Sequence, residues 1–366
     1  MRILIFLLVS VFLFAESKYC NEITNNERST YIYVDSTLTN KKFLSKLLMK
    51  KLKNSFLPHE RVVVLIFDPV SQQVEEKFNT CVPILSKEEI KKLNSGSWHL
   101  FTESPIDRAN EDFQFFVSTL RDVIKNVKVN DNDDSDKKRL VEIFYNQSNR
   151  FEKPLNRVII LSDMMQNSNT FPLSAVLNNN FKNIKEYKTN FNYSDVYVLM
   201  DKKRLKSSNF KHLRDFWSYY FEYNNAVLKN FDTDIKLPSY KYLETKFYEG
   251  EMEFKDGSTY TVKLMFNYSK NKVNNGWFVI EGVDAIPLKG KLYVKHGKVK
   301  KGVFNFDTDE SFHIFSKSER IEVTFNGKKV TGEIKSINTN LILVTPKGHQ
   351  LKNPKILLNL EKSDEY

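Results

Sequence analysis

Five side chains with hydroxyl or carboxylate oxygens stand where apolar runs of the sequence begin or end: Asp35, Thr37, Thr39, Ser104 and Asp163. The first three follow the β-rich run 30–34 at alternate positions, Ser104 precedes a long helical pattern, and Asp163 follows the apolar run 157–162. Carboxylates and hydroxyls are hard oxygen ligands of the kind that Mg²⁺ binds in proteins. Each residue taken alone is equally a helix cap, because Asp, Ser and Thr satisfy free N–H groups at helix starts.

The elements around these residues alternate between strands and helices. Continuous apolar runs without polar alternation, typical of strands buried on both faces, occur at 31–34, 61–67, 157–162 and 195–200. Helical spacing follows or separates them at 43–52, 106–124 and 210–223. Strands that alternate with helices predict an α/β fold with a doubly wound, mainly parallel sheet, with 74–82 as an antiparallel edge strand. The carboxyl ends of parallel strands share one edge, where the five residues would gather.

The pattern changes to β from about Tyr240. Helical spacing disappears, and turn dipeptides such as Asp256-Gly257 and Asn326-Gly327 join short β runs. Two hairpins are predicted, 251–254 with 260–264 and 321–325 with 329–334. The chain therefore divides into an α/β domain at 28–235, with an acidic insertion at about 128–150, and a separate all-β domain at 240–366, which is a sandwich or a small barrel.

Charge and composition narrow the class of partner. The chain of 366 residues has a formal net charge of +11. Its lysines are scattered among Asn and Glu and do not form the arginine-rich blocks of nucleic-acid-binding segments. A Lys-rich, solvated surface that associates with anionic polymers of a cell envelope fits this pattern better than a nucleic-acid partner.

The amino-terminal residues predict export. Residues 1–15 combine an early Arg2, an apolar run and the small Ala15, which is the layout of a signal peptide. The apolar run is shorter than the roughly twenty residues of a membrane span, so no transmembrane segment is expected in the mature chain. The two cysteines, Cys20 and Cys81, would then meet an oxidising periplasmic or extracellular compartment, where a disulfide is plausible and two free thiols are the alternative.

The order of the five oxygen-bearing residues resembles the von Willebrand factor A-type domain and its metal-ion-dependent adhesion site. The family pattern is Asp-x-Ser/Thr-x-Ser/Thr after the first strand, a Thr before a long helix, and an Asp after the fourth strand. Asp35, Thr37 and Thr39 match the first element, Ser104 takes the hydroxyl position of the second, and Asp163 matches the third. Two departures are Ser104 for the usual Thr and Met164, which follows Asp163 where glycine is common. The resemblance covers about residues 30–231.

The resemblance implies one Mg²⁺ or Mn²⁺ with few protein ligands and an open position that an acidic side chain of a protein partner fills. Chemistry agrees, because an ion bound mainly by hydroxyls and few carboxylates stays strongly electrophilic. The chain is therefore expected to be an exported binding protein rather than an enzyme, with the β domain as a second contact or an assembly module.

Two alternatives stay open from the sequence. An envelope enzyme would use the same metal for hydrolysis or a carboxylate pair such as Glu281 and Asp284 on carbohydrate. Separately, the aspartates at 131, 133, 134 and 136 loosely resemble a calcium loop, but Asp136 stands where that loop has glycine. A solvated segment that leads into a helix at about 140–144 is the simpler interpretation.

Overall fold

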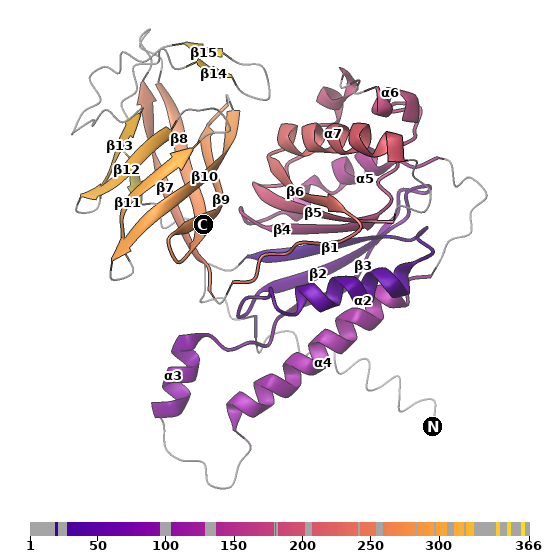
Figure 1. Cartoon of the computed structure of the whole chain (residues 1–366), viewed down its shortest axis with the longest axis horizontal. Coiled ribbons are helices and arrows are strands. Elements are labelled where there is room, and N and C mark those ends of the chain that lie inside the picture. Colours follow the sequence, from indigo (N-terminus) through magenta and orange to yellow (C-terminus); the bar gives the residue numbers. More distant parts are fainter. Residues whose placement is uncertain are drawn as a thin grey trace.

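The computed structural model consists of an α/β part followed by a β part (Figure 1). The residues that it describes are 19–20, 28–95, 104–128, 137–178, 180, 182–201, 207–240, 242–253, 259–282, 284–295, 298–305, 311–317, 320–325, 342–344, 350–352 and 360–362. The proposed signal peptide, the aspartates at 131–136 and the strand predicted at 329–334 lie outside these residues.

A six-stranded sheet in the described residues forms the centre of the α/β part. Its strands are β1 (Ser29–Asp35), β2 (Arg61–Phe67), β3 (Val74–Cys81), β4 (Arg157–Ser162), β5 (Ser194–Met200) and β6 (Ala226–Asp232). They lie in the order β3-β2-β1-β4-β5-β6, and all neighbouring pairs are parallel except β2 and β3. This confirms a mainly parallel, doubly wound sheet with an antiparallel edge strand.

Helices cover both faces of the sheet (Figure 1). The chain forms α2 (Lys41–Leu52), α3 (Lys87–Ser95), α4 (Pro105–Lys125), α5 (Leu140–Asn146), α6 (Leu173–Leu177) and α7 (Ser207–Tyr223), with 3₁₀ turns η1 (Ser148–Arg150) and η2 (Lys182–Tyr187). Apolar side chains of α2 and α4 pack on one face, and those of α5, α6 and α7 pack on the other. Because both faces are covered, β1 and β4 are buried along their whole length, as their unbroken apolar sequences predict.

The segment expected as an acidic insertion ends inside the core. Leu140, Ile143 and Phe144 of α5 are buried against the sheet, where Phe144 packs edge-on against Tyr33 of β1. The helix at 140–146 agrees with the sequence pattern, although no side chain caps its start. The second half of 128–150 is therefore a structural part of the α/β fold.

The β part is a closed antiparallel barrel, the second of the two architectures expected. Its described strands are β7 (Glu244–Glu253), β8 (Thr259–Ser269), β9 (Lys272–Ile280), β10 (Asp284–Lys295), β11 (Lys298–Asn305), β12 (Ser311–Lys317), β13 (Arg320–Phe325) and β16 (Leu360–Lys362), and β14 (Ile342–Val344) pairs separately with β15 (Gln350–Lys352). The first predicted hairpin is confirmed as β7 and β8, in which Glu251 pairs with Thr261.

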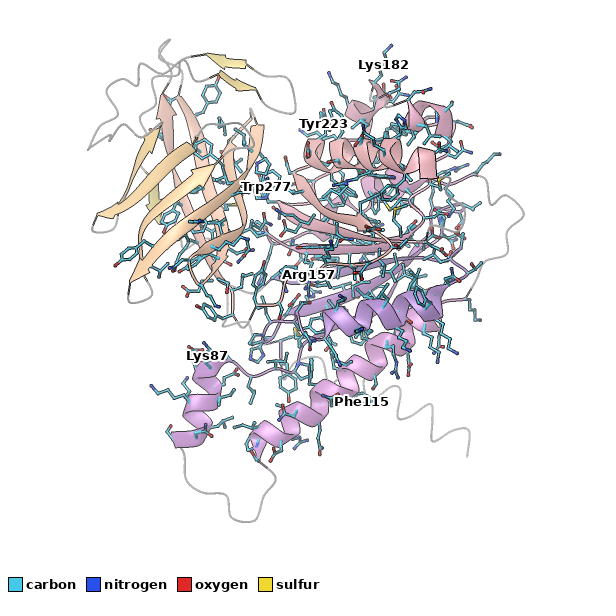
Figure 2. All side chains as sticks on the ribbon, viewed as in Figure 1. Lys87, Phe115, Arg157, Lys182, Tyr223 and Trp277 are labelled. Atoms are coloured by element: carbon cyan, nitrogen blue, oxygen red, sulfur yellow. A yellow bond between two sulfur atoms is a disulfide. The ribbon has the colours of Figure 1, made fainter. Side chains whose placement is uncertain are left out.

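The outer wall of the barrel packs on the α/β part through an apolar contact. Trp277 and Met265 on the barrel are buried in one cluster with Leu155, which precedes β4, and the partly buried Tyr193, which precedes β5, packs against this cluster. The Trp277 and Tyr193 rings lie 5.4 Å apart, and Asn275 Nδ2 donates to the Tyr193 carbonyl at 2.8 Å. Figure 2 shows Trp277 at the boundary between the two parts. The barrel therefore contacts the loops that precede the parallel strands.

The disulfide expected from the two cysteines is present. Cys20 and Cys81 are joined across 61 residues, with 5.3 Å between their Cα atoms. The preceding Tyr19 is held as well, because its hydroxyl donates to Asp112 on α4 and its carbonyl lies 2.9 Å from Nδ1 of His59. A disulfide of this kind indicates a non-cytoplasmic location. Among the described helices, none is long and apolar enough to span a membrane.

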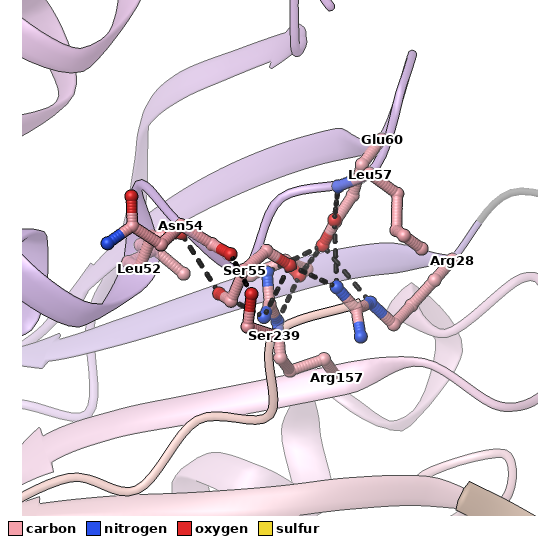
Figure 3. Close-up of polar contacts among 9 residues, drawn as sticks. Arg28, Leu52, Asn54, Ser55, Leu57, Glu60, Arg157 and Ser239 are labelled. Carbon is pink, nitrogen blue, oxygen red and sulfur yellow. Dashed lines mark hydrogen bonds and ion pairs between the residues drawn. The ribbon is translucent and has the colours of Figure 1, made fainter. Parts of the chain in front are cut away.

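A buried ion cluster closes the end of the sheet where β1, β2 and β4 begin (Figure 3). Glu60 is fully buried and accepts hydrogen bonds from Arg28 Nη2 at 2.9 Å and from Arg157 Nη2 at 2.7 Å. Arg157 Nη1 also donates to Ser55 Oγ at 2.8 Å. Burial raises the pKa of Glu60, but Arg157 and Arg28 outweigh it, so that this pKa lies below its ordinary value. Burial and the nearby Arg28 lower the pKa of Arg157 to about 10.

Glu60→Gln should lower the free energy of unfolding by about 3–5 kcal/mol, because it leaves two buried guanidinium groups without their carboxylate. The pKa of Glu60 is depressed in the folded state, so its contribution is complete above its ordinary value of 4.5 and is lost as pH falls through the folded pKa. Urea unfolding as a function of pH should therefore show an acid-labile component in the wild type that Glu60→Gln lacks. Glu75→Gln, on the exposed edge strand, is the control and should change little. Equal stability of all three proteins would contradict this role.

Trp277→Ser should uncouple the barrel from the α/β part, because it removes the largest apolar side chain of their contact and leaves a cavity. Differential scanning calorimetry should then show the barrel melting separately and earlier than in the wild type. Tyr293→Ser is the matched control, since Tyr293 is an aromatic residue on the same barrel with 48% of its surface exposed. An unchanged single transition in Trp277→Ser would show that the contact does not couple the two parts.

Candidate functional site

Two carboxylates meet at the switch point of the sheet, where the chain connections from neighbouring strands lead in opposite directions. β1 and β4 are parallel neighbours, with β2 on the far side of β1 and β5 on the far side of β4. Asp35 is the last residue of β1, and Asp163 directly follows β4. Open α/β sheets bind ligands in the crevice outside the carboxyl ends of strands at such a point.

Asp35 is fully buried and accepts four hydrogen bonds. Its Oδ1 receives the Thr37 backbone N–H at 2.8 Å and the Thr37 hydroxyl at 2.7 Å. Its Oδ2 receives the Ser162 hydroxyl at 2.9 Å and Lys138 Nζ at 3.2 Å. The Asp-x-Thr spacing therefore fixes the carboxylate through its own turn, and β4 supplies a further donor.

Lys138 is the residue that the sequence analysis did not identify. Its ammonium group donates to Asp163 Oδ2 at 2.8 Å, to Thr37 Oγ1 at 3.0 Å and to Asp35 Oδ2 at 3.2 Å. An ammonium has three N–H groups, so these three oxygens use all of its donors. The Lys138 side chain is only 3% exposed, as oxygens of the turn after β1 and of the residue after β4 surround its ammonium group.

The backbone around Lys138 is fixed on both sides. Lys138 N–H donates to the carbonyl of Asn167 at 3.0 Å, and Asn167 N–H returns a bond to Lys138 at 2.8 Å. The next amide, that of Arg139, donates to the Pro69 carbonyl at 2.9 Å, and α5 begins one residue later. A short backbone segment that is hydrogen-bonded to Asn167 and Pro69 thus holds the ammonium group beside the carboxylates.

Electrostatics at the cluster favour a charged lysine. Burial lowers the pKa of Lys138, but Asp35 and Asp163 outweigh it, so that the pKa lies above its ordinary value. Burial, together with the negative charge of Asp35, raises the pKa of Asp163 despite the attraction of Lys138. Two carboxylates share one ammonium, so the cluster with both ionised has a net charge of −1.

The loop after β4 has a left-handed backbone conformation at Met164, a residue other than glycine. Met164 has φ of +55°, the left-handed region in which glycine is the common residue. Trp217 Nε1 on α7 donates to the Met164 carbonyl at 2.8 Å, and Met165 N–H donates to Asp163 Oδ1 at 3.0 Å. These bonds hold the strained turn and orient Asp163 toward Lys138.

Ser104 does not join this cluster, and the prediction that it supplies a ligand is corrected. It caps α4, where its Oγ accepts the Ile106 N–H. The opposite end of α4 is the one beside Asp35, because Lys41 Nζ bonds the carbonyls of both Ser36 and Val127. A helix of 21 residues is about 30 Å long, so Ser104 lies at the end of α4 that is remote from the cluster.

Thr39 is exposed, and none of its side-chain atoms bonds to a described residue. The next residue, Asn40, instead reaches across the edge, where its Nδ2 donates to both carboxylate oxygens of Asp201 at 3.1 and 3.2 Å. Of the five predicted residues, the structure therefore brings together Asp35, Thr37 and Asp163, whereas Thr39 stays on the rim and Ser104 lies elsewhere.

The expected divalent ion does not fit this arrangement while Lys138 is in place. The oxygens of Asp35, Thr37 and Asp163 converge on the ammonium nitrogen, so an ion that used the same three oxygens would occupy the same position. Mg²⁺ would also require them at about 2.0–2.1 Å, closer than the 2.8–3.2 Å seen around the nitrogen. Within the part of the chain that the structure describes, no three His, Cys, Asp or Glu side chains are grouped to hold a metal.

Comparisons with known proteins show no family for the chain. No family model and no curated protein matches it. The human COPII-coat protein Sec24c is a similar solved structure, at 10% sequence identity and a TM-score of 0.29. That match covers 95% of this chain and 45% of the Sec24c chain, so this chain spans less than half the length of Sec24c. A likeness at this level carries no conclusion about function.

Lys138→Met should lower the free energy of unfolding by about 3–5 kcal/mol, because it keeps the bulk of the side chain but leaves two buried carboxylates without a cation. The adjacent Lys137→Met is the control, since Lys137 is exposed. Urea unfolding at neutral pH measures both. Equal stability of the two variants would show that Lys138 does not hold the carboxylates in solution.

Proposed function

We propose that the chain is an exported binding protein whose α/β part, similar to a von Willebrand factor A-type domain, docks an acidic protein partner. The barrel supplies a second contact or fixes the α/β part in an assembly. The observation that carries the docking proposal is the exposed lysine row of α2 beside the exposed Phe43. The likeness to the family is supported by the meeting of Asp35, Thr37 and Asp163 at the switch point of the sheet. These residues match the first and third elements of the family pattern.

Burial of the cluster argues against catalysis by its carboxylates. Asp35 and Asp163 are both at most 4% exposed, and each is occupied by hydrogen bonds from the protein itself. A general base must reach the proton that it removes, and these carboxylates face an ammonium group instead. Of the carboxylate pair considered for an enzyme acting through the barrel, Glu281 is engaged by Lys263 at 2.7 Å.

The surface that we assign to docking is the exposed side of α2, which starts at the rim of the carboxyl edge. Lys42, Lys46 and Lys50 recur at intervals of four residues and are exposed. Phe43 lies beside this row with 65% of its surface exposed. The helix contains no acidic residue to neutralise the lysines. A positive row next to an exposed aromatic ring suits an acidic partner with an apolar anchor site.

Export supports the same proposal. The signal-like residues 1–15 and the Cys20–Cys81 disulfide agree with a periplasmic or secreted protein. In such a compartment, the net charge of +11 favours association with acidic proteins and anionic envelope surfaces. A contact through Mg²⁺ or Mn²⁺, which the family resemblance implies, requires Lys138 to leave the oxygens first, whereas a contact through α2 does not.

The triple variant Lys42→Glu, Lys46→Glu, Lys50→Glu should lose capture of the acidic partner from envelope extract, because it reverses the charge of the docking row. The measurement is capture on tagged protein, with and without a chelator, followed by mass spectrometry of the captured chains. Loss of the wild-type capture in chelator alone would instead indicate the metal-mediated contact.

A matched control reverses the same number of lysines on the other face of the sheet. Lys182→Glu, Lys185→Glu and Lys188→Glu alter exposed positions in and next to η2, and Lys182 projects from the far end of the α/β part in Figure 2. This variant has the same net charge as the first and should capture the partner like the wild type. Equal loss in both variants would mean that net charge, and not the α2 surface, governs capture.

A further inference from the structure

We propose that the ammonium group of Lys138 permanently takes the place of a divalent cation at the carboxyl edge of the sheet, so that this protein binds no metal there. The claim concerns the ion position alone and is independent of whether a partner docks on α2. It makes the cluster of Asp35, Thr37, Asp163 and Lys138 an internal ion site whose cation is part of the chain.

The match between donors and acceptors supports this role. One hydroxyl and two carboxylates, contributed by two segments that are 126 to 128 residues apart in sequence, converge on a single nitrogen. Three N–H donors meet three oxygens at 2.8–3.2 Å, which satisfies the ammonium fully without water or a partner. A metal in the same position would keep several waters and one exchangeable ligand.

The tether gives the lysine a large advantage over a dissolved ion. The backbone of Lys138 is paired with Asn167, and the following amide bonds Pro69, so the ammonium is always held near its oxygens. An attached group competes at an effective concentration in the mM range or higher, without losing translational freedom on binding. A divalent ion would have to displace this group and leave the lysine charge beside its own.

The substitution also removes the chemistry of an adhesive metal site. A bound metal attracts a partner's carboxylate through its open coordination position, but Lys138 has no N–H left to offer. With both carboxylates ionised, the cluster also has a net negative charge, which disfavours an approaching carboxylate. Docking that depends on this edge should therefore be insensitive to chelators, and recognition must use the exposed rim.

The position of Lys138 in the chain explains how a lysine reaches the ion position. In the family pattern, a hydroxyl residue precedes a long helix, and Ser104 before α4 is the residue of this chain that matches it. Here a second, shorter helix, α5, begins next to the cluster, and Lys138 stands two residues before it. The Lys138 side chain extends from this helix start to the oxygens of Asp35, Thr37 and Asp163.

Mn²⁺ titration followed by electron paramagnetic resonance tests the proposal with wild type, Lys138→Thr and Lys137→Thr. Removing the ammonium leaves two carboxylates and adds a hydroxyl, so Lys138→Thr should gain a saturable site for one Mn²⁺ per chain. The wild type and Lys137→Thr, which alters an exposed neighbour, should show no site-specific binding.

Two results overturn the proposal. Wild-type protein that binds one Mn²⁺, with loss of binding in Asp35→Asn/Asp163→Asn, would show that Lys138 moves aside for the metal. A folded Lys138→Thr that binds no better than wild type would show that the lysine is not what excludes the ion. If Lys138→Thr does not fold, equal absence of specific Mn²⁺ binding in wild type and Asp35→Asn/Asp163→Asn supports the proposal.

Discussion

Two ionised carboxylates at the ends of adjacent parallel strands are costly to bury together unless a cation lies between them. Asp35 and Asp163 are in this position because β1 and β4 are neighbours and end at the same edge. Desolvation and mutual repulsion would otherwise cost several kcal/mol. Lys138 meets this constraint, and its placement in turn requires the pairing of its backbone with Asn167 and the start of α5 directly behind it.

The amino edge of the sheet also buries an ion cluster, but there positive groups outnumber negative ones. There one buried carboxylate, Glu60, lies between Arg28 and Arg157. The barrel packs beside this amino edge through Tyr193 and Trp277. Ion clusters inside the chain thus hold both ends of the sheet, and the barrel contacts the amino edge.

Much of this arrangement could be predicted from the sequence, where local chemistry decides it. Unbroken apolar runs predict the parallel sheet. Because the carboxyl ends of parallel strands share an edge, the sequence also predicts that Asp35, Thr37 and Asp163 lie close together. The position of Ser104 could not be read from its capping pattern alone. β3 is antiparallel to β2 and ends at the amino edge, and α4 runs from that side toward Asp35, so its start is the end remote from the cluster.

Lys138 and Trp277 escaped prediction for a different reason. Lys138 stands in the run Lys137-Lys138-Arg139, and nothing local distinguishes the buried lysine from its exposed neighbour. The topology distinguishes the two lysines. The chain runs from α5 through η1 into β4, so α5 must begin at the carboxyl edge of the sheet. Trp277 lies in the run 276–280, which contains no polar residue. A run of this kind indicates that both faces of β9 are covered.

The central claim, that a lysine occupies the ion position, is tested most directly by a crystal structure of the wild-type protein grown with excess Mn²⁺. The account predicts Lys138 Nζ within hydrogen-bond distance of Asp35, Thr37 and Asp163, and no anomalous peak among these oxygens. An anomalous Mn²⁺ peak there, with the Lys138 side chain turned away, would contradict it.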